Sequence, residues 1–300
     1  MPNWNDVLRE LQQFEINNAR RLDIVRRGHL ENLFRYTNRN VIVYYSGYMS
    51  KPAVPQSDIN DEDKNGFMMA VHRMNRSLGL DLILHTPGGS IAATQSIVHY
   101  LHWMFKDNIR AIIPQQAMSA GTMMACSCKE ILLAKHSNLG PIDPHLRGIP
   151  AYGIIQEFKR ACREVKKDRS ITPIWQAIIQ QYRPSFLSQC EQAIKWSNSF
   201  VENELVDNML QGVPDARTKA KKIVKALSNY RDNKAHERHL HFEECKKLGL
   251  KVGLIEDDPN LQDLILTVHH CFMHVLMNTP AYKMIENHMG ITLVKNAAQQ

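Results

Sequence analysis

Residues 85–95 read HTPGGSIAATQ, in which two consecutive glycines follow a proline and lead into a helical pattern. The apolar run directly before them, Leu80–Leu84, is typical of a short buried strand. A strand that turns through Gly-Gly into a helix leaves backbone N–H groups beside a helix N-terminus, which suits a phosphate or a developing oxyanion. The segment lacks the third glycine or Gly-Lys-Ser/Thr sequence of phosphate loops. Taken alone, the turn is also explained by a tight corner of the chain.

Strands and helices alternate on both sides of this turn. Short apolar runs predict strands at residues 41–45, 80–84, 109–113, 130–133 and 252–255. Helical periodicity predicts helices at residues 4–36 and 67–78, after residues 90 and 119, through most of the chain from Pro150 to about residue 235, and from about residue 260. This alternation predicts an α/β fold in which helices cover a parallel sheet.

The composition indicates a globular chain. Its 300 residues suit one large domain or two small ones, and 44% of them are hydrophobic and 22% charged. The net charge of +7 would suit an acidic partner, but the basic residues are scattered and no aromatic-interleaved basic motif is present. We therefore expect a solvated basic surface and no strong nucleic-acid signal. Nucleic-acid binding through Arg20, Arg21, Arg26 and Arg27 is kept as an alternative that steep salt dependence would reveal.

Cysteine usage and hydropathy indicate the cell compartment. The six cysteines show no disulfide-like spacing, and Cys126 and Cys128 lie inside an apolar helical stretch where they point to different faces. No run approaches the roughly 18 apolar residues of a membrane span, and the N-terminus lacks the apolar region of a signal peptide. We expect a soluble, cytoplasmic protein with reduced thiols and no transmembrane segment.

A second short stretch, AMSAG at residues 117–121, strengthens the oxyanion interpretation. Ser119 sits where a predicted strand gives way to a helix and has small neighbours. A hydroxyl at such a corner projects into a site while the next amide points at the same place. The alternative is that Ser119 caps the helix, as serine commonly does.

Three motifs together carry a resemblance to a known family. HTPGGSIAAT, PQQAMSAGT and LGPIDP follow one another in the order and at the separation seen in the Clp-protease and signal-peptide-peptidase superfamily. More narrowly, the chain resembles the serine dehydrogenase proteinase group over roughly residues 38–270. The resemblance implies a ClpP/crotonase-like ββα spiral with additional helices at the N-terminus and in the C-terminal half. We expect an N-terminal helical segment at 1–37 and a protease domain at 38–300, with a mostly helical stretch at about 170–235.

The resemblance also implies site residues. Ser119 corresponds to the nucleophile, and the oxyanion amides correspond to Gly89, together with Gly88, and to Ala120. Each lost oxyanion donor would cost roughly 3 kcal/mol of transition-state stabilisation.

The motifs indicate the general base less directly than they indicate the nucleophile and the oxyanion amides. In Clp proteases it is a histidine on an "NS…H" segment, to which residues 136–145, HSNLGPIDPH, correspond. If Ser137 aligns with that serine, Ile142 or Asp143 takes the place of the histidine, and His145 lies two or three residues later. His145 is therefore an alternative base. Asp143 is interpreted as a residue that caps or braces the loop, or else orients the base.

Signal-peptide-peptidase relatives use a lysine from a downstream helix instead, which points to Lys159, forty residues after Ser119. Burial lowers the pKa of a lysine toward the neutral amine that a base requires. Lys159 lies in or beside a predicted apolar helical stripe made of Ile154, Ile155, Phe158, Cys162 and Val165. Lys166 is the second lysine candidate for the general base. Alternatively Lys159 lays its stem along the core and keeps its charge in water, so that another lysine or histidine is the base.

Clustered histidines raise the question of a metal. His236, His239, His241 and Cys245 are possible ligands, but HERHLHFEEC matches no familiar zinc spacing. We expect a structural use for these residues, with no metal and no cofactor.

The leading hypothesis is a cytoplasmic serine peptidase that hydrolyses peptides or partly unfolded proteins through an acyl-enzyme. The resemblance implies a homo-oligomer, in which the helical stretch could supply subunit contacts, gate entry or dock a partner. The sequence contains no ATPase module, so energy-driven unfolding would require a separate ATPase or adaptor. One alternative is an inactive scaffold of the same fold. Another is a coenzyme A–dependent hydratase or isomerase, although AMSAG offers none of the paired carboxylates that such enzymes use.

Overall fold

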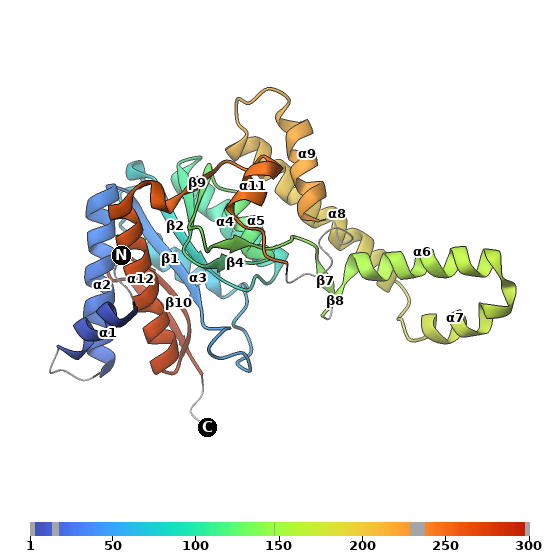
Figure 1. The fold of residues 1–300 in the computed structure, drawn as a ribbon, viewed down its shortest axis with the longest axis horizontal. Helices are drawn as coiled ribbons and strands as arrows, with labels where there is room; N and C mark the ends of the chain where they lie inside the picture. The colour runs from blue at the N-terminus through green and yellow to red at the C-terminus, as the bar shows by residue number, and fades with distance from the viewer. Residues whose placement is uncertain (1–3, 14–17, 147, 229–237, 298–300) are drawn as a thin grey trace.

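The computed structural model describes residues 4–13, 18–146, 148–228 and 238–297. Across these residues a mixed sheet of seven strands runs in the order β11-β10-β1-β2-β3-β5-β9 (Figure 1). Its strands are β1 (Asn40–Ser46), β2 (Leu80–His85), β3 (Ile109–Ile113), β5 (Glu130–Leu133), β9 (Val252–Leu254), β10 (Ala281–Asn287) and β11 (Thr292–Asn296).

The five strands from β1 to β9 are parallel, which confirms the predicted α/β class. Every residue of β1 and β2 is buried. Burial on both faces is expected for parallel strands that helices cover, because the connecting helices must pack on the sheet. Val43 and Tyr45 contribute to one hydrophobic core and Ile42 and Tyr44 to another, as the alternation of side chains along a strand requires.

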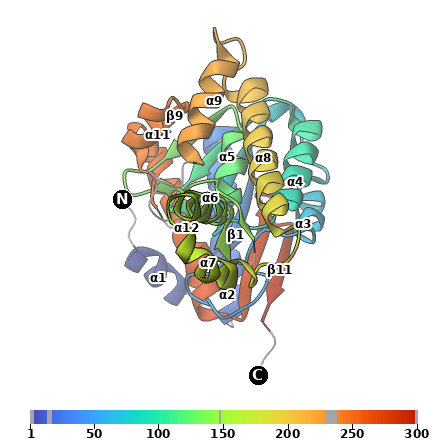
Figure 2. The same cartoon turned by 90° about the vertical axis from the view of Figure 1, so that its right-hand side faces the viewer.

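Two groups of helices cover the two faces (Figures 1 and 2). The core containing Val43 joins β1 to α1 (Trp4–Gln12), α2 (Asn18–Thr37) and α12 (Pro259–Asn278). The core containing Ile42 joins it to α3 (Asp63–Val71), α4 (Ile91–Phe105), α5 (Ala120–Cys126), α9 (Ala216–Leu227) and α11 (Phe242–Leu248). The predicted helix at 67–78 is shorter than expected, because α3 ends at Val71 and only the short 3-10 turn η1 (Arg76–Leu78) follows.

The C-terminal hairpin of β10 and β11 is a feature that the sequence did not predict. Strand β10 pairs antiparallel with β1, so the sheet is mixed rather than wholly parallel. The sequence of β10, AYKMIEN, places a lysine and a glutamate at fully buried positions. Charged residues at core positions interrupt the apolar pattern by which a buried strand is recognised.

The helical stretch after Pro150 forms an arm that extends away from the sheet (Figures 1 and 2). It contains α6 (Ala151–Lys167), η2 (Arg169–Ile171), α7 (Thr172–Ile179) and the first part of α8 (Phe186–Glu204), which continues into the π-helical turn η3 (Leu205–Met209). The arm has its own small core of Ala151, Ile154, Ile155, Phe186 and Cys190. At its base lie the short strands β7 (His145–Leu146) and β8 (Ile149–Pro150).

Two further observations bear on the predictions. All six cysteines are free, and only Cys162 is exposed. Within the described ranges, no helix has both the length and the apolar character that a bilayer crossing requires.

Candidate active site

The glycine turn and the serine turn lie side by side, as predicted. The turn after β2 meets β4 (Gln116–Ala117), the short strand before Ser119, through a parallel bridge between Thr86 and Ala117. The Thr86 N–H donates to the Gln116 carbonyl at 3.2 Å, and the Met118 N–H donates to the Thr86 carbonyl at 3.0 Å. These bonds fix the two segments in one register.

Small residues are required where the two turns touch. A Cβ atom added to Gly88 would lie 2.7 Å from the Met118 carbonyl oxygen and 2.7 Å from the Cβ of Ser119. A Cβ added to Gly121 would lie 2.5 Å from Cγ2 of Thr86. Gly88 also has a φ of 100°, a conformation that only glycine adopts easily. The glycines of both motifs therefore let the backbone beside Ser119 come into direct contact with the glycine turn.

Ser119 occupies a strained corner at the start of α5. Its φ of 50° and ψ of −115° are unusual for a residue with a side chain. It stands at the N-cap position, yet its hydroxyl makes no capping hydrogen bond, and the side chain is only partly buried. The capping interpretation of this serine is therefore wrong, and the hydroxyl is available at the surface of a cavity.

Two of the three predicted oxyanion amides remain available. The Gly88 N–H donates to Oγ1 of Thr86 at 3.1 Å, which removes Gly88 from the donor set. The N–H groups of Gly89 and Ala120 have no acceptor among the residues that the structure describes. Ala120 is the first residue of α5, where helix geometry leaves the N–H without a partner in the helix.

A cavity of about 380 Å³ opens in front of Ser119. Gly89, Ser119 and His145 contribute to its wall. Apolar side chains make up most of the remainder: Pro87, Ile91, Ala92, Met123, Pro144, Leu146, Ala193 and Trp196. The indole N–H of Trp196 donates to Oε1 of Gln95 at 2.9 Å, which ties α8 to α4 across one side of the cavity.

Among the described residues that line this cavity, His145 is the one histidine. Its Nε2 atom lies 3.6 Å from Oδ2 of Asp143, whose side chain is only 1% exposed, while that of His145 is 28% exposed. The alignment with Clp proteases placed Ile142 or Asp143 where those enzymes have their histidine, and both side chains are buried. The buried carboxylate of Asp143 thus lies beside a histidine that lines the cavity.

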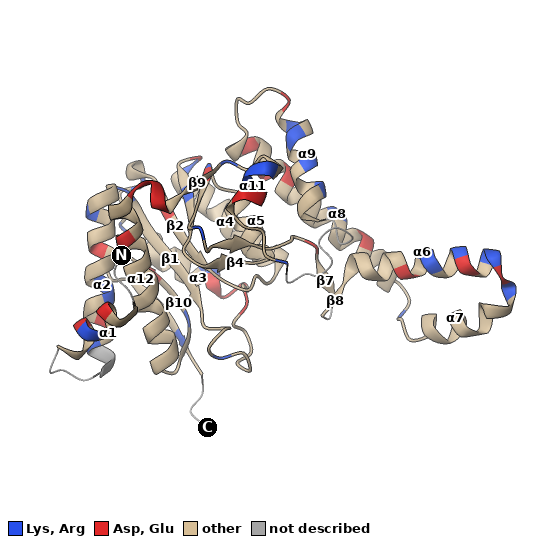
Figure 3. Cartoon of the chain, viewed as in Figure 1, with Lys and Arg blue, Asp and Glu red and all other residues tan. Residues whose placement is uncertain are grey.

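The two predicted lysines lie elsewhere. Lys159 and Lys166 are exposed on α6, and neither lines the cavity. Lysine and arginine residues alternate with acidic ones along this part of the arm (Figure 3). Because α6 carries Lys159 out along the arm, the structure does not bring it to Ser119.

His85 ends β2 just before the glycine turn and is fully buried. Its ring lies 5.4 Å from those of Tyr45 and Tyr48, and neither ring nitrogen has a hydrogen-bond partner in the described ranges. Burial lowers the pKa of His85 to about 4, because the charged imidazolium would lose its hydration. Burial likewise lowers the pKa of the neighbouring His269 well below its usual range.

The histidine-rich segment serves the fold. The backbone N–H of His241 donates to Oε2 of Glu244 at 3.1 Å at the start of α11. Cys245 is fully buried, and its thiol contacts the Leu240 carbonyl oxygen at 3.5 Å. His236 lies outside the described residues. Among those described, no cluster of three or more histidine, cysteine, aspartate or glutamate side chains could hold a metal ion.

Sequence reasoning missed the residues that support the glycine turn. Oγ1 of Thr86 accepts a hydrogen bond from the Gly88 N–H. Ile59, in the loop that precedes α3, forms a bridge with Gly89. A threonine two residues before a Gly-Gly pair is a weak local signal for such a bond. Nothing near Ile59 in the sequence indicates its contact.

Comparison with known proteins adds independent findings. Residues 19–265 match the model of a family described as ClpP-like SDH-type serine proteinase. Two uncharacterized proteins of Methanocaldococcus jannaschii are also similar. MJ0137 is 28% identical over 210 residues, which make up 70% of this chain and 64% of that protein. MJ1495 is 29% identical over 195 residues, which make up 65% of this chain and 59% of that protein. The matched region thus spans about three fifths of the length of these relatives.

Proposed function

The chain belongs to the family of ClpP-like SDH-type serine proteinases, and from this we propose that it is a serine peptidase in which His145, oriented by Asp143, activates Ser119. The observation that carries the proposal is the shared cavity. An uncapped serine hydroxyl, the Gly89 segment with its unused N–H and an imidazole paired with a buried carboxylate all meet there. These are the parts of an acyl-transfer site: nucleophile, base with its orienting group, and oxyanion donors.

The proposed reaction proceeds in two halves. The Ser119 oxygen attacks the peptide carbonyl carbon while its proton passes to His145, and the N–H groups of Gly89 and Ala120 donate to the resulting oxyanion. His145 then protonates the leaving amine, the C–N bond breaks, and an acyl-enzyme remains. A water molecule repeats the attack with His145 as base, which releases the acid and restores Ser119. Asp143 stabilises the imidazolium in both halves.

The proposed substrate is an extended peptide or a partly unfolded protein. A cavity of about 380 Å³ with mostly apolar walls suits an apolar side chain next to the cleaved bond. A folded substrate would have to expose such a side chain together with free backbone.

The test compares wild type with Ser119→Ala, His145→Gln and Lys159→Ala on an unstructured protein substrate and with an alkylphosphonate probe. We expect Ser119→Ala to abolish labelling and His145→Gln to lower kcat roughly 10⁴- to 10⁶-fold, as loss of a nucleophile or base does in serine peptidases. We expect Lys159→Ala to match wild type. Activity lost in Lys159→Ala but kept in His145→Gln would establish the lysine dyad instead. Absence of both labelling and hydrolysis in wild type would favour the inactive scaffold.

Assembly and location extend the proposal. We expect a homo-oligomer that uses the projecting arm for contacts, a separate ATPase or adaptor for folded substrates, and a cytoplasmic location. The free and mostly buried cysteines suit a reducing compartment. Sedimentation equilibrium of wild type and of a variant with Ile174→Glu, an exposed apolar residue on α7, tests the role of the arm. An unchanged mass for the variant would contradict it.

A further inference from the structure

The segment Ser57–Asp63 runs beside the glycine turn and holds it by backbone hydrogen bonds. The N–H of the fully buried Ile59 donates to the Gly88 carbonyl oxygen at 2.7 Å. The Ile59 carbonyl oxygen in turn accepts from the Ser90 N–H at 2.8 Å. These two bonds flank Gly89, which makes a parallel bridge with Ile59.

The first of these bonds sets the direction of the Gly89 N–H. In a planar trans peptide the carbonyl and the N–H point to opposite sides, and the structure has no cis peptide among its described residues. Because the Gly88 carbonyl points to Ile59, the N–H of the same peptide, which belongs to Gly89, points away from Ile59. A rotation of this peptide would present the carbonyl in place of the N–H and remove one oxyanion donor.

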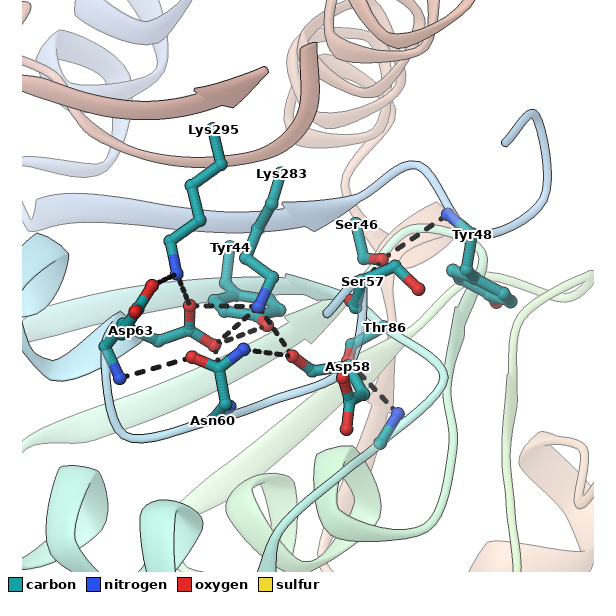
Figure 4. A network of polar contacts seen from close by, with 12 residues as sticks. Tyr44, Ser46, Tyr48, Ser57, Asp58, Asn60, Asp63, Thr86, Lys283 and Lys295 are labelled. Carbon is teal, nitrogen blue, oxygen red and sulfur yellow. Dashed lines mark hydrogen bonds and ion pairs between the residues drawn. The ribbon is translucent and has the colours of Figure 1, made fainter. Parts of the chain in front are cut away.

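A buried ion pair holds the segment that makes these bonds (Figure 4). Nζ of Lys283, on β10, lies 3.0 Å from both carboxylate oxygens of Asp63 and donates to the Asp58 carbonyl at 2.5 Å. The Asp63 carboxylate also accepts from the Tyr44 hydroxyl at 2.9 Å and from the Asn60 N–H at 3.0 Å. The residues on both sides of Ile59 are therefore tied to the sheet by Lys283 and Asp63. Lys295, on β11, adds a longer contact to Asp63 at 3.7 Å, and the Ser46 hydroxyl donates to the Ser57 carbonyl at 2.6 Å.

The net stability that this ion pair contributes is too small to explain why two charged residues are buried here. Both side chains are fully buried, and taking two charges out of water costs about as much as their attraction returns. Burial lowers the pKa of Lys283, while the attraction of Asp63 opposes that shift. A purely apolar contact would hold β10 to the core as well. It would not supply an acceptor and a donor for the main chain at Asn60 and Asp58.

We infer that Lys283 and Asp63 are positioning residues, which keep the Gly89 N–H directed into the active site by fixing Ile59 against the Gly88 carbonyl. The inference rests on the proposed function, since it assigns the pair to the oxyanion site of that reaction. It also assigns a task to the C-terminal hairpin, which is remote from Ser119 in sequence and supplies no residue to the cavity wall.

The test replaces the polar cluster by apolar residues of similar volume in the triple variant Tyr44→Phe/Asp63→Leu/Lys283→Met. Such replacements of buried ion networks commonly preserve stability. The variant therefore loses the polar contacts to the main chain at Asp58 and Asn60, while the core remains filled. The matched control is Arg26→Met/Glu286→Leu. This pair also includes a residue of β10, Glu286, and its partner Arg26 lies on α2. Both side chains are fully buried, with Nε to Oε2 at 2.5 Å, and in the described part of the chain no hydrogen bond or ion pair joins either of them to residues 57–63.

Three measurements are made on each variant: the melting temperature, kcat and KM on a peptide substrate, and amide hydrogen exchange of residues 86–95. For the triple variant we expect kcat to fall roughly 100-fold, the effect of one lost oxyanion donor, with unchanged KM and melting temperature. We expect faster exchange of the glycine turn in the triple variant. The control should match wild type in kcat and in exchange of this segment.

A folded triple variant with wild-type kcat and wild-type exchange would overturn the inference while leaving the proposed function intact. If the triple variant fails to fold, Asp63→Asn/Lys283→Met retains the volume of both side chains but removes the ion pair and the bond from Lys283 to the Asp58 carbonyl. It should show a smaller fall in kcat, because the amide oxygen still accepts from the Asn60 N–H, and wild-type kcat in this variant would overturn the inference. If wild type neither hydrolyses peptides nor reacts with phosphonate, the proposed function fails. The exchange measurement still decides whether the pair holds the turn.

Discussion

Replacing Gly89 by alanine would place a methyl group inside the backbone of the neighbouring segment. A Cβ at Gly89 would lie 2.8 Å from the Cα of Ile59 and closer still to its N and O atoms. These are main-chain atoms, so no side-chain rotation relieves the contact. The two segments would have to separate, and the hydrogen bonds between Ile59 and its partners Gly88 and Ser90 would break.

The magnitude follows from these contacts. Two lost backbone hydrogen bonds cost about 1 kcal/mol each, and forcing a methyl group into a filled space costs about 1–3 kcal/mol. The φ of 151° at Gly89 adds about 1 kcal/mol for a residue with a side chain. We expect Gly89→Ala to lower the free energy of unfolding by about 4–6 kcal/mol, the sum of these contributions. Displacement of its N–H should lower kcat roughly 100- to 1,000-fold.

The assay pairs urea denaturation with kcat on a peptide substrate, measured where the variant remains folded. Gly212→Ala is the matched control, because Gly212 has a φ of 75° but no atom within 4 Å of an added Cβ. It should lose only about 1 kcal/mol, from its backbone conformation, and keep wild-type kcat. If Gly89→Ala were as stable and as active as Gly212→Ala, the close approach of Ile59 and the role of the Gly89 amide would both be refuted.

Two further predictions concern buried polar groups near the site. Thr122→Val should cost roughly 1–2 kcal/mol in urea denaturation, because Oγ1 of Thr122 donates to the Ala117 carbonyl at 2.9 Å and accepts from the Gly140 N–H at 3.0 Å. Thr122→Ser, which keeps the hydroxyl, should cost less, and equal losses would argue against these bonds. For His85, the pKa of about 4 in the folded chain lies below the ordinary 6.5, so its contribution to stability is complete above pH 6.5 and declines as the pH falls toward 4. Between pH 7 and pH 5 this residue should lower the free energy of unfolding of wild type by about 2 kcal/mol. The free energy of unfolding of His85→Phe should fall by that much less over the same range. Equal falls in the two proteins would contradict the assigned pKa.

The sequence predicts the parallel part of the fold because its local signals agree with the tertiary structure. Residues 80–84 and 109–113 are short apolar runs between turn residues, and both are strands buried on either face. The hairpin at residues 281–296 escaped prediction since Lys283 and Glu286 occupy core positions of β10. Their charges are neutralised by residues far away in the chain, Asp63 and Arg26. No local pattern contains that information.

The meeting of the serine turn with the glycine turn was predictable from the sequence, whereas the position of Lys159 was not. Ser119 and Gly89 belong to short motifs whose small residues are visible in the sequence, although Ile59, which holds the glycine turn, is not. An apolar stripe on α6 correctly predicted a packed helix, but not what it packs against. The inner residues of α6 pack against Phe186 and Cys190 within the arm, so Lys159 is carried away from the site. Counting from Ser137 assumed the loop geometry of another family, so His145 was only an alternative in the sequence, although it lines the cavity beside Ser119.

The backbone conformation at Ser119 supports the proposed catalytic role of this residue. A residue with a side chain at a φ of 50° costs about 1–2 kcal/mol relative to glycine, and a capping hydrogen bond worth about 1 kcal/mol would offset much of that cost. The Ser119 hydroxyl makes no such bond. Glycine would therefore serve the fold better at this corner, as it does at Gly88. The proposed function accounts for a serine that adds strain and leaves its helix uncapped, because it assigns a use to the hydroxyl in the cavity that Ser119 shares with Gly89 and His145.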